Sequence, residues 1–64
     1  MTTYFKCNAV CTKNDNDGFE VGDVYEVLEV NDTDVIENDR GQEMECAFFS
    51  GGLILCHNSE FKEC

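Results

Sequence analysis

Five clusters of Gly, Asn and Asp divide this chain into short segments, and they constrain its fold more than any other feature. The clusters stand at residues 14–18, 22–23, 31–34, 38–41 and 51–52. Proline is absent, so the tight turns depend on these residue types. The intervening segments are roughly five to ten residues long and favour β structure, because many of their residues are β-branched or aromatic. This spacing predicts a small all-β domain.

The two strongest strand predictions lie in the first half of the chain. Residues 3–13 alternate in part between apolar and polar side chains, and residues 24–30 are rich in valine on both faces. The second pattern is typical of a strand that is coiled or covered on both faces. The apolar face of the first strand is expected to carry Phe5, Cys7, Ala9 and Cys11.

One hairpin can be interpreted residue by residue. Residues 39–41 fit a three-residue loop with glycine at the left-handed position. That loop places Ile36 opposite Met44 on the core face, and Glu37 opposite Glu43 on the other face. Like charges in direct opposition destabilise a strand pair, so these glutamates indicate either a solvated acidic face or a surface that awaits a basic partner. The remaining expected features of this hairpin are the pair Val35–Glu45 and a core position at Cys46.

The C-terminal third gives weaker signals. An apolar run at residues 53–56 follows the glycine pair, and Phe61 is expected to close the core. Phe48 and Phe49 are expected to complete the core, one ring inside it and the other as a lid over an open end of the barrel. The alternative is that one of the two rings is exposed and serves as a binding anchor. Together the segments predict one domain, residues 1–64, folded as a small barrel of about five antiparallel strands.

Two motifs carry a resemblance to a known group of proteins. Residues 21–27 read V-G-x-x-Y-E-V and residues 38–43 read N-D-x-G-x-E, with Cys11 as an early cysteine. This pattern resembles a group of short, mostly uncharacterised bacterial and bacteriophage proteins, over roughly residues 10–45. The resemblance implies an SH3-like small barrel and a phage origin. It implies no particular activity, because the group has none in common.

The charge balance is the most informative feature for function. Fourteen acidic residues against four basic ones give a net charge of −10, which argues against direct binding of nucleic acid or anionic membrane. Twelve of the acids lie between residues 15 and 45 with Arg40 as the only cation, a net charge of −11. Such a field either keeps a small protein soluble or steers a protein partner with a basic surface. The expected contact residues are Asp32, Asp34, Glu37, Asp39, Glu43 and Glu45.

The cysteines and the N-terminal sequence indicate a compartment. Residues 1–10 lack the apolar core of a secretory signal, and the longest apolar run, residues 53–56, is too short to span a bilayer. Five cysteines in such a chain predict reduced thiols. We therefore expect a cytoplasmic protein, in the host cytoplasm if it is encoded by a phage.

Metal binding and catalysis have little support. Cys7 and Cys11 have a spacing that zinc sites use, but in an extended strand they would lie about 13 Å apart. Cys56 and His57 are adjacent, so on a strand they point to opposite faces and cannot act as nucleophile and base. We expect no cofactor and no enzymatic activity.

The sequence thus predicts a small acidic binding module. It would act by protein–protein interaction on a host or phage protein, as an inhibitor of a nucleic-acid-binding protein, and it would be a monomer or a weak oligomer. Two alternatives stay open, namely a zinc-stabilised mini-domain and a structural or assembly accessory.

Overall fold

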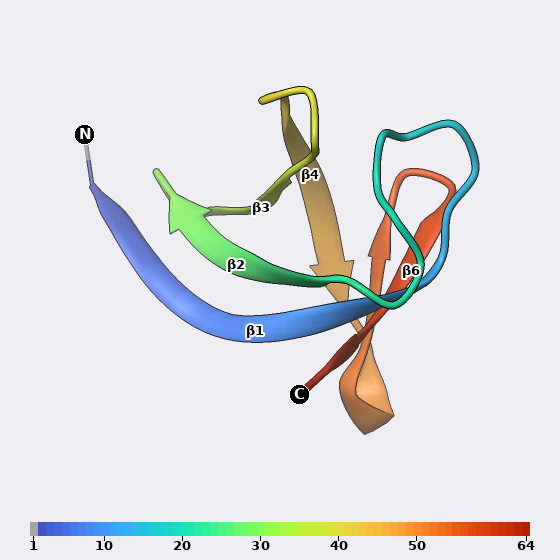
Figure 1. The fold of residues 1–64 in the computed structure, drawn as a ribbon. Helices are drawn as coiled ribbons and strands as arrows, with labels where there is room; N and C mark the ends of the chain where they lie inside the picture. The colour runs from blue at the N-terminus through green and yellow to red at the C-terminus, as the bar shows by residue number, and fades with distance from the viewer. Residues whose placement is uncertain (1) are drawn as a thin grey trace.

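The computed structural model describes residues 2–64 and confirms the predicted all-β small barrel. Within this range, six antiparallel strands follow one another in sequence order, and the last pairs with the first to close the barrel (Figure 1). A 3₁₀ turn, η1 (Ser50–Gly52), joins the fourth strand to the fifth. The strands are β1 (Thr3–Lys13), β2 (Val24–Val30), β3 (Thr33–Glu37), β4 (Glu43–Phe48), β5 (Leu53–Cys56) and β6 (Ser59–Glu63).

The two longest strands wrap around the barrel side by side. β1 and β2 have the bounds that the sequence predicts, and both curve strongly along their length (Figure 1). The first part of β1 pairs with β2, and its second part pairs with both β2 and β6. One long bent strand therefore contributes to both halves of the barrel.

A β-bulge in β1 corrects one prediction about its apolar face. Phe5 pairs with Leu28 and Cys7 with Val27, so Lys6 is an extra residue in the ladder. An extra residue shifts the alternation by one position, which turns Phe5 away from the core face. Phe5 is accordingly 57% exposed, and the expectation that it shares a face with the cysteines is wrong. The core side of β1 carries Ala9 and Cys11, fully buried, and Cys7, partly buried.

Three aromatic rings pack edge to face at one end of the core. The ring centroids of Phe19 and Phe61 are 4.8 Å apart, and Tyr25 lies 5.1 Å from Phe19 and 5.7 Å from Phe61. Perpendicular rings at these separations stabilise a core beyond the area they bury. Phe19 comes from the long loop of residues 14–23, teal in Figure 1, which lies beside the β5–β6 turn. The loop is thus part of the hydrophobic core.

The β3–β4 hairpin has the predicted register. Ile36 pairs with Met44 on the core side and Glu37 pairs with Glu43 on the outer side. Gly41 has a φ of 80°, the left-handed conformation that the three-residue loop requires. The choice of turn residues and the alternation of the flanking segments therefore determine this hairpin together.

The C-terminal part contains one strand more than the sequence indicated. β6 forms two pairings, with β5 and with β1, and places Phe61 fully inside the core as expected. Phe48 packs against the core, whereas Phe49 is 51% exposed. The prediction that both rings complete the core therefore holds for Phe48 alone, because adjacent residues at a strand end point to opposite sides.

Candidate functional site

The outer face of β3 and β4 carries three exposed carboxylates. Because Ile36 and Met44 point into the core, their strand neighbours Glu37, Glu43 and Glu45 point outward together. Glu37 lies directly opposite Glu43. Within residues 2–64, none of the three takes part in an ion pair. We call these three residues the acidic face.

The other predicted contact residues do not join this face. Asp34 pairs with Glu29 across β2 and β3, on the same side of the sheet as the core, and its Oδ1 lies 3.0 Å from Lys6 Nζ. Asp39 accepts a hydrogen bond of 3.0 Å from the Tyr25 hydroxyl. Asp32 is exposed in the β2–β3 turn with a positive φ of 68°. The structure thus brings three of the six predicted residues onto the outer face of the β3–β4 pair, while Asp34 lies on the opposite face of β3.

Lys6, the bulge residue, is held by groups of the barrel itself. Its ammonium lies 3.0 Å from Asp34, 3.8 Å from Glu29 and 4.9 Å from the ring centre of Phe48. The hydrogen bond with Asp34 raises the pKa of Lys6 and so favours its charged form. This cation compensates two inward-facing acids and leaves the acidic face uncompensated.

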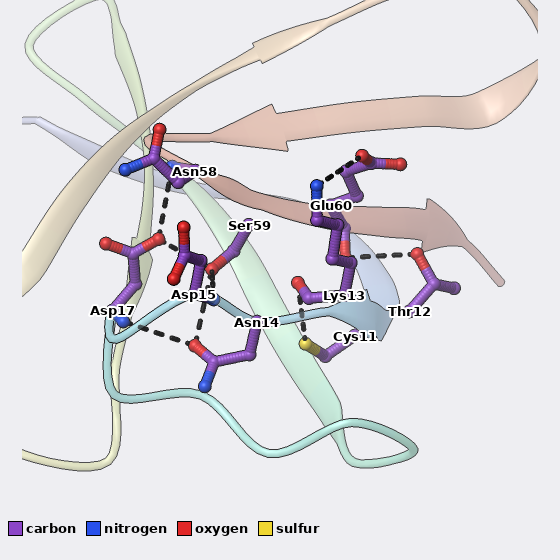
Figure 2. Close-up of polar contacts among 9 residues, drawn as sticks. All are labelled: Cys11, Thr12, Lys13, Asn14, Asp15, Asp17, Asn58, Ser59 and Glu60. Carbon is purple, nitrogen blue, oxygen red and sulfur yellow. Dashed lines mark hydrogen bonds and ion pairs between the residues drawn. The ribbon is translucent and has the colours of Figure 1, made fainter.

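A buried polar network fixes the long loop to the β5–β6 turn (Figure 2). Asp17 Oδ2 accepts hydrogen bonds from Ser59 Oγ at 2.6 Å and from the Asn58 backbone N–H at 3.1 Å. Asn14 Oδ1 accepts from the backbone N–H groups of Asp17 and Phe19, each at 3.3 Å. These bonds satisfy the polar groups of the loop in the interior. The network therefore holds the long loop against the β5–β6 turn.

Asn38 is the second buried polar centre. Its side chain donates to the Asp17 carbonyl at 2.8 Å and to Gln42 Oε1 at 3.0 Å. Its Oδ1 accepts from the backbone N–H groups of Arg40 and Gln42, at 3.0 and 2.9 Å. The sequence places Asn38 and Asp17 in turn clusters and gives no sign of their burial, because Asn and Asp occur in turns for local reasons. Only the placement of the long loop against the hairpin reveals them as buried.

The thiols lie mostly in the interior. Cys46 and Cys56 are cross-strand neighbours of β4 and β5. Burial raises the pKa of Cys46 to about 12 and that of Cys56 to about 11. Such thiols stay protonated at neutral pH, which opposes a role as nucleophile. In the part of the chain that the structure describes, no three or more His, Cys, Asp or Glu residues are grouped so that they could hold a metal ion.

A shallow depression of about 240 Å³ lies between the ends of β1, β5 and β6. Its walls include Lys62 as the one charged residue and lack acids, cysteines and histidine, so it offers no constellation for acid–base or nucleophilic chemistry. The residues that line it are Thr12, Gly51, Leu53, Phe61 and Lys62. Across residues 2–64, no helix has the length and apolar character needed to cross a membrane.

Comparison with known proteins gave no match, whether to a family model, to a curated protein or to a solved structure. The resemblance of residues 10–45 to short bacterial and bacteriophage proteins therefore stays a prediction. Function must be inferred from the geometry and charge of the barrel surface.

Proposed function

We propose that this chain is a small acidic binding module that acts without catalysis, by binding a basic surface of another protein through its acidic face. The observation that carries the proposal is the direct opposition of Glu37 and Glu43 on an exposed strand pair. An opposed pair of like charges costs stability in the free protein. A basic partner would remove that repulsion on binding.

The charge distribution supports the same conclusion. The solvent-accessible surface is 4039 Å², so the net charge of −10 amounts to roughly one negative charge per 400 Å². The charge is concentrated in residues 15–45, which include β2, β3 and the start of β4. A negative field of this strength accelerates encounters with basic partners and repels nucleic acid.

The partner class follows from this charge. Basic protein surfaces of sufficient extent are typical of proteins that bind nucleic acid. The module would occupy such a surface and compete with the nucleic acid for it, which makes it an inhibitor of a host or phage protein. A phage origin and a cytoplasmic location also belong to this proposal. The phage origin rests on the resemblance of residues 10–45, and the location rests on the five cysteines, which are expected to be reduced.

The test uses two variants with equal net charge. E37K/E43K/E45K reverses the acidic face, and D15K/E20K/D23K reverses three exposed acids of the long loop. The immobilised proteins are exposed to bacterial lysate at low salt, eluted with rising salt, and the eluted proteins are identified by mass spectrometry. We expect the wild type and the loop variant to retain a stoichiometric nucleic-acid-binding protein that the face variant loses. Equal loss in both variants would mean that net charge, and not a defined face, is responsible.

A further inference from the structure

An apolar row adjoins the acidic face on the outside of the barrel. Phe5 on β1 pairs with Leu28 on β2, Leu28 pairs with Val35 on β3, and Val35 pairs with Glu45 on β4. Side chains at paired positions project from the same face of a sheet, with Cβ atoms about 5 Å apart. Phe5, Leu28 and Val35 therefore form a continuous row that ends at a member of the acidic face. We call these three residues the apolar row.

The bulge at Lys6 is what creates this row. Regular alternation would place Phe5 inside with Cys7, but the extra residue in the ladder turns the ring outward, where 57% of it is exposed. Val35 is only 6% exposed although it is not part of the central core cluster. It is therefore covered on the outer side of the sheet, where Leu28 and Phe5 are its row neighbours. The exposed ring thus stands at the end of a packed outer patch.

We propose that the apolar row and the acidic face together form one docking surface for a protein segment in which a large apolar side chain accompanies a cluster of Lys and Arg. This inference rests on the proposed function and names the chemistry of its partner. Phe5 lies on β1 and the acids Glu43 and Glu45 on β4, three strand spacings away, or about 14 Å along the sheet. The apolar and basic parts of the segment would be separated by a similar distance, which about four extended residues span.

Charge complementarity selects this occupant over a second copy of the chain. A second copy that docked on the same surface would bring its Glu37, Glu43 and Glu45 against the same three residues of the first copy. Each copy carries a net charge of −10. Like-charge contacts of this kind oppose association. An apolar segment without cations would leave the carboxylates facing it without a partner, so the basic cluster is needed as well.

The experiment uses two synthetic peptides of equal charge, in place of the unidentified partner. In the first, two leucines are separated by about four residues from three lysines; in the second, serines replace the leucines. Both peptides are made in both chain directions, and their affinities for the folded protein are measured by fluorescence anisotropy at low salt. The protein variants are Phe5→Ser and, as a matched control, Phe49→Ser, which removes an exposed ring outside the apolar row. Amide spectra establish that each variant is folded.

We expect the wild type to bind the leucine peptide about tenfold more tightly than the serine peptide, as burial of apolar side chains predicts. Phe5→Ser should abolish this difference and Phe49→Ser should preserve it. In the wild type, the leucine peptide should shift the amide resonances of Leu28 and Val35, and the serine peptide should not. This measurement needs no variant, so it tests the inference even if Phe5→Ser fails to fold.

Equal affinity of the two peptides for the wild type, or no detectable binding at millimolar concentration, would overturn the inference about the apolar row. Its failure is distinguishable from that of the proposed function. If E37K/E43K/E45K loses both peptides while Phe5→Ser changes neither, the acidic face binds and the apolar row does not. If E37K/E43K/E45K binds both peptides as the wild type does, the proposed function is wrong as well.

Discussion

Two regions of this barrel use polar side chains in opposite ways. Where the long loop meets the hairpin and the β5–β6 turn, Asp17, Asn38 and Ser59 are buried and hydrogen-bonded. On the outer side of β3–β4, Glu37 and Glu43 are exposed and face each other without a cation. The first region stabilises the fold. In the second, the repulsion between the two carboxylates lowers the stability of the free protein.

The difference shows that polar residues in a small acidic protein must be interpreted by their surroundings. A buried carboxylate with two donors repays its desolvation through hydrogen bonds. An exposed carboxylate next to another contributes repulsion, which only a partner, a counterion or salt relieves. Substitutions in the two regions should therefore change stability in opposite directions.

The largest effect is expected for Asn38→Ala. The substitution removes bonds from a buried side chain to the Asp17 carbonyl and Gln42, and leaves the backbone N–H groups of Arg40 and Gln42 without their acceptor. We expect a loss of about 2–4 kcal/mol in the free energy of unfolding, measured by urea titration. Asn8→Ala, at an exposed position of β1, is the control and should stay within about 0.5 kcal/mol. If Asn38→Ala and Asn8→Ala lost similar amounts of stability, the buried hydrogen bonds of Asn38 would not stabilise the fold.

Ser59→Ala should have the next largest effect. The Ser59 hydroxyl donates at 2.6 Å to a buried carboxylate oxygen of Asp17, and its oxygen lies 3.3 Å from Asn14 Oδ1. Loss of a bond to a charged group costs about 1.5–3 kcal/mol. Thr12→Ala removes an exposed bond of 3.2 Å to the Glu60 carbonyl and should cost about 0.5 kcal/mol or less. A Ser59 variant as stable as the Thr12 variant would show that the network does not hold the loop.

Alkaline pH should lower the stability of the barrel, because its buried thiols lose their protons more readily once the chain unfolds. Burial raises the pKa of Cys46 to about 12 and that of Cys56 to about 11, from 9.0 for a free thiol. Between pH 9 and 12 the unfolded chain therefore binds fewer protons than the folded one, and stability falls as pH rises. Urea midpoints measured from pH 7 to pH 10 should decrease, less steeply in Cys46→Ala than in Cys64→Ala, whose substituted thiol is exposed. Identical slopes in the two variants would contradict this assignment.

The sequence predicts this molecule best where local chemistry determines structure. The hairpin around Gly41 follows from its turn residues and alternation, and β1 and β2 follow from their β-branched and alternating patterns. The bulge at Lys6 has no sequence signature, so the outward position of Phe5 could not be predicted. β6 was missed because Phe61 is its only large apolar residue, and its second pairing partner is distant in sequence.

The candidate site was predictable to a similar extent. Alternation alone places Glu37, Glu43 and Glu45 on one outer face, which the register confirms. The involvement of Asp34 with Lys6 and of Asp39 with Tyr25 depends on contacts between distant segments. Sequence periodicity describes one strand at a time and carries no information on such contacts.

The smallest effect concerns the acidic face itself, and its sign is the informative part. Glu43→Gln keeps the size of the side chain and removes the repulsion from Glu37, so we expect a gain of about 0.2–1 kcal/mol in the free energy of unfolding. Glu45→Gln is the matched control, because Glu45 lies opposite Val35 and loses no like-charge pair. The gain should shrink at 1 M salt, where charges are screened within about 3 Å. If Glu43→Gln also weakens binding of the lysine peptides, the same carboxylate costs stability in the free protein and contributes affinity in the complex. A destabilised Glu43→Gln variant would instead show that this glutamate is part of the fold, and the contrast between the two regions would be lost.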